Sequence, residues 1–325
     1  MKQNRKDGRF RAVTRGMKKQ KQAQNPTQDA GGSKKKKKSH RGSNLLLLLI
    51  LLIGAAIAGY PAFSEYWNSM HQSRAIMGYA ERVAELSNEE YMDVWNDSLE
   101  YNRKMASDPN PRDMTDEEMD EYEKQLNVDG TGNMGFISIP KINVDLPIYH
   151  GTSDAVLQTS IGHIDGTSLP SGSVHSNPDD YSEVEFASHS VLSGHRGLPS
   201  AKLFSDLDAM EIGDVFYLTI LDQTLTYEVD KITVIEPQEM EELEIFPGKD
   251  LCTLMTCTPY GINTHRLLVR GSRIENEKQR LNVRITADGL KIQPLYVAPF
   301  IAVPVLILMI FWVLIMTSGR RKRRG

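Results

Sequence analysis

Two long uncharged stretches limit how this chain can fold. Leu45–Phe63 holds nineteen residues without a charge, and Leu295–Met316 holds twenty-two. As α-helices they would be roughly 28 Å and 33 Å long, close to the ~30 Å hydrocarbon core of a bilayer. Pro299 and Pro304 interrupt the second stretch, which membrane helices tolerate. We therefore expect two transmembrane helices.

Charge is distributed unevenly around these stretches. Residues 1–43 carry fifteen Lys and Arg against two Asp, and residues 320–324 are all basic. Between them, residues 44–316 hold eighteen basic and forty acidic residues, a net charge of −22. The positive-inside rule then places both termini in the cytoplasm and the acidic middle outside the cell. The basic ends are explained by topology and by contact with membrane lipid, so we predict no nucleic-acid partner.

The first stretch has a second interpretation as a cleaved signal peptide. Small residues near Ala55–Ala58 could form a cleavage site. The apolar region is long for a signal peptide, however, and the basic region before it exceeds forty residues. A membrane helix therefore remains the preferred prediction.

The chain is expected to divide into seven segments. Apolar residues recur at helical spacing within Ala75–Val83 and Tyr91–Met105, and Thr115 with Glu118 forms a capping box for a helix over Thr115–Gln125. The predicted segments are a disordered cytoplasmic tail (1–43), a transmembrane helix (44–63), an extracellular helical region (64–130), a β-rich domain (131–275), a juxtamembrane segment (276–294), a second transmembrane helix (295–316) and a basic cytoplasmic tail (317–325).

From Met134 the pattern changes to short apolar runs separated by Gly, Pro, Asn and Asp. About eight such runs within roughly 140 residues indicate one β-barrel or β-sandwich. The polar segment Ser171–Ser188 is expected to be a long loop. The predicted strands lie within residues 136–142, 144–149, 191–192, 215–220, 225–229, 232–235, 251–256 and 267–269.

The two cysteines lie on one predicted strand. Two cysteines exclude a disulfide scaffold and a multi-cysteine zinc module. Cys252 and Cys257 are five residues apart, so they point to opposite faces and lie roughly 16 Å apart, beyond disulfide reach. Cys252 is expected in the core. Cys257 ends the strand, where its side chain could meet a substrate.

A nucleophilic cysteine needs a basic partner and a donor for the oxyanion that forms at the attacked carbonyl. His195 lies between Gly194 and Gly197, on a tight turn after a predicted strand. Arg266 starts the strand after Cys257, so the connecting turn would bring the two residues together. A single His or Arg at such positions is more often structural, so the residues alone leave the roles open.

Several motifs together resemble the sortase family. The run Thr253–Gly271 (TLMTCTPYGINTHRLLVRG) resembles the active-site signature of sortases, more narrowly of class C, the pilus-building sortases of Gram-positive bacteria. His195–Phe204 matches the family's histidine segment, Ile139–Gly151 matches its first two barrel strands, and Gly162–Pro170 matches the next segment. The resemblance covers about residues 75–275.

The resemblance implies a mainly β fold, an eight-stranded sortase β-barrel with N-terminal helices and two flanking transmembrane helices. It implies that Cys257 is the nucleophile, His195 the acid–base partner and Arg266 the oxyanion or substrate-positioning residue, while His265 remains structural. A class C sortase cleaves an LPXTG-like sorting signal of a pilin through a thioester. It then joins the pilin to a Lys amine of another pilin.

Class C members often cover the site with a lid built around Asp-Pro-aromatic. Here residues 108–111 begin with Asp108 and Pro109, but Asn110 replaces the aromatic residue. The hypothesis is that Asp108 pairs with Arg266 and plugs the cleft, with a looser lid than an aromatic one. The alternative is an ordinary proline-rich turn with no role as a lid.

Two other functions stay open. One is a housekeeping-type sortase that attaches proteins to the cell wall, and the other is a non-catalytic sortase-like membrane scaffold. No cofactor or metal site is predicted. The acidic run within Asp116–Glu123 is interpreted as a solvated helix face. A second acidic cluster, Glu239, Glu241, Glu242 and Glu244, is the position where weak Ca²⁺ binding stays open, because some sortases of other classes bind calcium.

Overall fold

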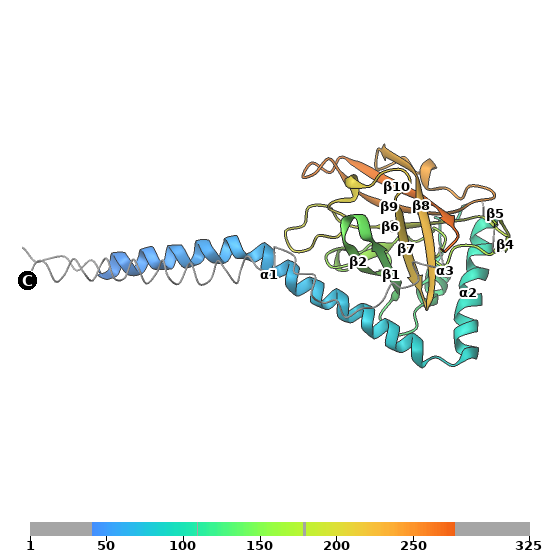
Figure 1. The fold of residues 1–325 in the computed structure, drawn as a ribbon, viewed down its shortest axis with the longest axis horizontal. Coiled ribbons are helices and arrows are strands. Elements are labelled where there is room, and N and C mark those ends of the chain that lie inside the picture. The colour runs from blue at the N-terminus through green and yellow to red at the C-terminus, as the bar shows by residue number, and fades with distance from the viewer. Residues whose placement is uncertain (1–40, 109, 178–179, 277–325) are drawn as a thin grey trace, which may run out of the picture. The chain divides into compact units, whose positions relative to one another are not determined.

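The computed structural model describes residues 41–108, 110–177 and 180–276, and contains an eight-stranded closed β-barrel preceded by helices (Figure 1). The α-helices are α1 (Arg41–Glu85), α2 (Asn88–Ser107), α3 (Asp116–Lys124) and the single-turn α4 (Asp154–Leu157). The strands are β1 (Asn133–Ile139), β2 (Val144–His150), β3 (Ile161–His163), β4 (His175–Asn177), β5 (Asp180–Val184), β6 (Ser188–Ser193), β7 (Val215–Ile220), β8 (Gln223–Ile235), β9 (Asp250–Thr258) and β10 (His265–Ile274).

The barrel has the strand order β1-β2-β3-β6-β9-β10-β8-β7, and β7 pairs with β1 to close it. The β2–β3 and β6–β9 pairs are parallel and the remaining pairs are antiparallel. Closure leaves no free sheet edge in the barrel. The predicted eight-stranded β-barrel is therefore confirmed.

Alternation along the strands divides the apolar side chains between two clusters. On β9, Cys252 and Leu254 face the main core inside the barrel. Met255, between them and the strand end, faces an outer cluster instead. The outer cluster consists of Val191, Ile235, Leu243 and Leu268, with Ile164, Met240 and Met255 packed against it.

Both helices α2 and α3 begin at capping boxes. The Thr115 hydroxyl accepts from the backbone N–H of Glu118 at 3.2 Å, and Glu118 accepts from the backbone N–H of Thr115 at 2.7 Å. Ser87 and Glu90 form the same reciprocal pair at the start of α2. The capping box predicted for Thr115 is thus confirmed, and each box satisfies N–H groups that have no partner within the helix.

Helix α1 contains the first predicted membrane stretch. In the described part of the chain it is the one helix long and apolar enough to cross a membrane, with a mean hydropathy of 2.4. A signal sequence would have the same character, so both interpretations remain. Of the predicted segments, 295–316 and 317–325 lie outside the described residues, as do residues 1–40 of the segment 1–43 and residues 277–294 of the segment 276–294.

Buried tyrosines attach α1 and α3 to the barrel. The Tyr79 hydroxyl donates to the carbonyl of Met134 at 2.9 Å and accepts from the N–H of Leu221 at 2.8 Å. The hydroxyl of Tyr122 lies 2.9 Å from Nδ1 of His163 on β3. Burial raises the pKa of both tyrosines above its usual value, so they bond as neutral phenols.

Asn102 attaches α2 to the segment after β3. Its Nδ2 donates to the carbonyls of Leu169 and Gly172 at 3.1 and 2.8 Å, and to Ser171 Oγ at 3.2 Å. Its Oδ1 accepts from the N–H of Leu169 at 2.6 Å. Because Asn102 is fully buried, these backbone groups have no water to replace it.

Three strand predictions were wrong in detail. The runs 225–229 and 232–235 form one long strand, β8, rather than two. The three-residue strand β3 was not predicted as a strand, and its addition restores the number eight. The expected loop 171–188 carries the two-stranded sheet β4–β5, whose polar side chains lack the apolar alternation used to find strands.

Replacing Asn102 by Ala is expected to lower the free energy of unfolding by about 3 kcal/mol, because it leaves buried backbone groups of Leu169 and Gly172 unpaired. Denaturant unfolding of the full chain in detergent measures this. Asn96→Ala, at an exposed position of the same helix, should change stability by less than about 0.5 kcal/mol. Equal effects of the two substitutions would contradict the anchoring role.

Candidate active site

Cys257 lies near the end of β9, where the strand leaves the barrel. Its side chain is partly exposed, whereas Cys252 on the opposite face of the strand is fully buried. Both cysteines are free, as predicted. Burial raises the pKa of the Cys252 thiol well above its usual value, with the Asp250 carboxylate adding to the effect. Cys252 is therefore inert, and Cys257 is the accessible thiol.

Arg266 lies directly opposite Cys257 on the neighbouring strand. β10 pairs antiparallel with β9, and Arg266 and Cys257 are register partners. Side chains of directly opposed residues project from the same face of a sheet, so the guanidinium and the thiol share one face. Nη1 of Arg266 donates to the carbonyl oxygens of Asn263 and His265 at 3.4 and 3.1 Å, within the connecting loop.

His195 approaches from the other side of β9. The parallel β6–β9 pairing runs up to Ser193 and Met255, and the N–H of Gly194 donates to the carbonyl of Met255 at 3.0 Å. His195 and Cys257 each lie two residues beyond this last register pair. The carbonyl of Gly194 also accepts from Thr256 Oγ1 at 2.7 Å, which fixes the start of the histidine loop on β9.

Two of the predicted site residues continue the face that carries the outer cluster. Cys257 is two residues beyond Met255 on β9, and Arg266 is two residues before Leu268 on β10. A strand repeats its orientation every second residue. The apolar outer cluster therefore leads to Cys257 and Arg266 at the end of these two strands.

The segment after α2 contacts two other parts of the chain, at Gly166 and at Met240, through Pro111 and Arg112. The backbone of Pro111 and Arg112 passes so close to Gly166 that a Cβ there would lie 2.8 Å from it, and Gly166 has a φ of +71°. Glycine is needed for both reasons. Nη2 of Arg112 donates to the carbonyl of Met240, an outer-cluster residue, at 3.4 Å. The segment is therefore held beside the outer cluster.

The ion pair expected between Asp108 and Arg266 is not formed among the described residues. Asp108 ends α2 and its Oδ1 accepts from the N–H of Asn110 at 2.8 Å. Arg266 instead donates to carbonyl groups of its own loop. Pro109 lies outside the described residues. A local turn, rather than a bond to the site, therefore holds the Asp108 carboxylate.

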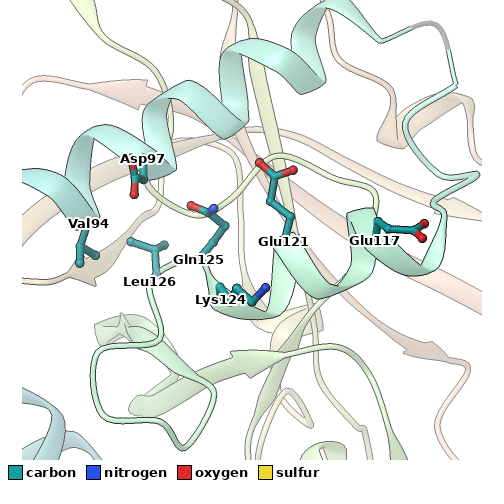
Figure 2. A pocket seen from close by; sticks show the side chains of 7 residues that line it. All are labelled: Val94, Asp97, Glu117, Glu121, Lys124, Gln125 and Leu126. Carbon is teal, nitrogen blue, oxygen red and sulfur yellow. The ribbon is translucent and has the colours of Figure 1, made fainter.

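Two cavities lie among the helices, and neither is lined by Cys257, His195 or Arg266. The larger has a volume of about 300 Å³ and lies between α2 and α3 (Figure 2). Its lining residues are Val94, Asp97, Glu117, Glu121, Lys124, Gln125 and Leu126. The smaller, about 80 Å³, includes Asp108 and Pro111 in its lining. The smaller cavity therefore lies beside the segment predicted as a lid and between α2 and α3.

The described ranges 41–108, 110–177 and 180–276 contain no candidate metal site. No group of three or more His, Cys, Asp and Glu side chains there has a suitable arrangement. Of the acidic cluster before β9, Glu242 forms an ion pair with Lys231, with a shortest N–O distance of 2.6 Å.

A family model for the sortase domain matches residues 137–274. Sortase C1 of Streptococcus agalactiae is 50% identical with a TM-score of 0.58, and the alignment covers 63% of this chain and all of that one. Sortase C of Clostridium perfringens, solved with the C-terminal cell wall sorting motif, is 40% identical with a TM-score of 0.53, covering 63% of this chain and all of that one. The chain belongs to the sortase family.

Within the family, the structural similarity lies with class C. A sortase C from Streptococcus pneumoniae is 39% identical with a TM-score of 0.53, covering 62% of this chain and 97% of that one. Similarity to curated sequences is more limited. Sortase A of Streptococcus agalactiae is 31% identical over 38% of this chain, and the match spans 47% of that protein's length. Sortase D of Bacillus subtilis is 28% identical over 43% of this chain, and the match spans 63% of that protein's length.

Two buried histidines of the barrel should make stability depend on pH. Burial lowers the pKa of His163 to about 3 and of His189 to about 4. Nδ1 of His189 contacts the carbonyl of Glu244 at 2.6 Å, and Nε2 contacts Thr253 Oγ1 at 2.7 Å. An unfolded histidine titrates near pH 6.5, so between pH 6.5 and 4 the unfolded chain binds more protons. Stability therefore falls as the pH drops through this window.

His189→Gln is expected to flatten this dependence, because glutamine can keep both hydrogen bonds and does not titrate. Denaturant unfolding at pH 7.0, 5.5 and 4.5 measures the change. His265→Gln, at an exposed position, should leave the pH dependence as in the unmodified protein. An unchanged slope for His189→Gln would show that this histidine does not contribute.

Proposed function

We propose that this chain is a cysteine transpeptidase that assembles covalent pili from protein subunits. The observation that carries the proposal is the convergence of three strand ends: β9 with Cys257, β10 with Arg266 directly opposite, and the loop after β6 with His195. These are the positions that match the sortase active-site motifs, in a chain whose structural relatives are sortases C.

Each of the three residues has a role in the proposed reaction. Cys257 attacks the Thr carbonyl of an LPXTG-like sorting signal, while Arg266 stabilises the negative charge that develops on the carbonyl oxygen. The Thr–Gly amide bond breaks, His195 donates a proton to the leaving Gly amine, and a thioester remains on Cys257. A Lys amine of another pilin then attacks the thioester, forms an isopeptide bond and releases the thiol.

The proposed substrates are inferred by analogy with two of the structural relatives. The Clostridium perfringens structure contains the C-terminal cell wall sorting motif, and the Streptococcus pneumoniae structure is described as informing pilin substrate specificity. We extend both to this chain, with a pilin as donor and a Lys of a second pilin as acceptor. A cell-wall-attaching sortase or a non-catalytic scaffold would give a different product or none.

The proposed location is the cell membrane, with the barrel outside. The apolar part of α1 supplies the first span, residues 44–63. Residues 295–316 supply the second, and the basic segments 1–43 and 317–325 hold both termini in the cytoplasm. The enzyme would then meet its substrates at the outer surface of the membrane.

Mass spectrometry of the full chain in detergent, incubated with an LPXTG-type peptide, tests the chemistry. We expect an acyl adduct on Cys257 that contains the peptide up to Thr. The adduct should be absent in Cys257→Ala and retained in Cys252→Ala. An adduct on neither cysteine, also after deletion of residues 108–111, would contradict the transpeptidase and favour the scaffold.

The lid at residues 108–111 remains a proposal, with Asp108, Pro109 and Asn110 at its centre. Asp108→Ala removes the acceptor for the Asn110 N–H and should loosen the segment. We expect iodoacetamide to label Cys257 about 3- to 10-fold faster, since one such hydrogen bond is worth about 1 kcal/mol. Asp97→Ala, at an exposed position on α2, is the control. Equal labelling rates for Asp108→Ala and the unmodified protein would contradict a lid.

A further inference from the structure

Arg196 follows His195, and its side chain is buried although the residue lies in a loop. The side chain is 8% exposed. Nη1 donates to Thr258 Oγ1 at 3.2 Å, and Nη2 donates to the carboxylate of Asp208. The guanidinium also lies over the ring of Tyr260, 5.9 Å from its centroid. Burying a guanidinium is costly unless its charge and donors are matched. Asp208 balances the charge, and Thr258 and Asp208 accept from the two terminal nitrogens, whereas Nε is buried without a hydrogen-bond partner.

Two of these partners belong to the loop that follows the nucleophile. Thr258 is the residue directly after Cys257, and Tyr260 lies two residues further on. The side chain next to the proposed acid–base residue therefore binds the chain next to the proposed nucleophile. Such a contact transmits the position of one loop to the other.

A second contact between the same loops depends on glycine. Gly197 has a φ of +79°, and a Cβ at this position would lie 2.9 Å from the ring of Tyr260. Glycine therefore allows the ring to pack against the backbone of the histidine loop. The N–H of Gly197 donates to Ser205 Oγ at 3.0 Å, and the carbonyl of His195 accepts from the N–H of Phe204 at 3.1 Å. The histidine loop is therefore held by Tyr260 and by hydrogen bonds with Phe204 and Ser205.

Backbone pairing between β6 and β9 ends before it reaches His195 and Cys257. The β6–β9 register ends at Ser193 and Met255, with one further bond from the N–H of Gly194. Beyond that point, side-chain bonds from Thr256 and Arg196 join the two loops. Proton transfer between a histidine and a thiol requires heavy-atom separations near 3 Å, so a small loop displacement has a large kinetic effect.

We propose that Arg196 is a positioning residue that holds His195 in line with Cys257 by joining the histidine loop to the Thr258–Tyr260 loop. The inference rests on the proposed function for the roles of His195 and Cys257. Asp208 balances the charge of the guanidinium and fixes its orientation. Lysine could reach one of the two polar partners but cannot reproduce the fork of donors.

The test measures alkylation of Cys257 by iodoacetamide as a function of pH, in the full chain in detergent. The variants are Arg196→Met, Arg196→Lys, Thr258→Val and His195→Ala. Arg103→Met is the matched control, because Arg103 also pairs with carboxylates and lies over an aromatic ring, 5.1 Å from the centroid of Phe186, but on α2. Thermal unfolding of each variant reports on folding separately.

We expect the alkylation profile of Arg196→Met to move at least half of the way toward that of His195→Ala. Smaller shifts are expected for Arg196→Lys and Thr258→Val, and none for Arg103→Met. With the sorting peptide, kcat for Arg196→Met should fall roughly 30- to 100-fold with little change in KM. Thr258→Val retains the arginine, so it tests the contact even where Arg196→Met unfolds.

Profiles of Arg196→Met and Thr258→Val that superimpose on that of the unmodified protein would overturn the inference. So would a His195→Ala profile identical to that of the unmodified protein, since no histidine would then be in line with the thiol. If the unmodified protein does not cleave the peptide but the alkylation series behaves as expected, the proposed substrate fails and the positioning role stands.

Discussion

The pairing of β9 with β6 on one side and β10 on the other is the interaction on which the site depends. The parallel β6–β9 pair carries the histidine loop to the end of β9, and the antiparallel β9–β10 pair returns Arg266 to the position opposite Cys257. Because a strand repeats its orientation every second residue, the β9–β10 register also places Cys257 and Arg266 on the face of the outer cluster. A shift of one residue in this pair would turn one of the two side chains away from the other.

A few buried hydrogen bonds attach the helices to the β-barrel domain. Tyr79, Asn102 and Tyr122 each bond to barrel groups from α1, α2 and α3, in places without access to water. The segment between α2 and α3 is thus anchored beyond both of its ends, while Asp108 and Asn110 bond to each other. Movement of the proposed lid would therefore be confined to this short segment, because opening there breaks fewer buried contacts.

Local sequence patterns predicted the elements that depend on local physics. The Thr115 capping box, the opposite faces of Cys252 and Cys257, and the exposed end of β9 follow from side-chain chemistry and strand alternation. Sequence patterns failed to predict strands that depend on tertiary contacts. β3 is three residues long and exists because β2 and β6 pair with it, and β4–β5 is polar. The Asp108–Arg266 pair was expected by resemblance, but local carbonyl and N–H groups bind these side chains instead.

The sequence by itself determined a charge-divided chain with two long uncharged stretches, a β-rich domain and one cysteine at a strand end in a sortase motif. These properties are encoded in composition and in short-range periodicity, which need no knowledge of distant neighbours. Only the tertiary structure decided that Arg196 is buried between Asp208, Thr258 and Tyr260. The reason is physical: the contact joins residues 62 positions apart through the barrel register, and nothing in the motif around His195 specifies what its neighbour will meet.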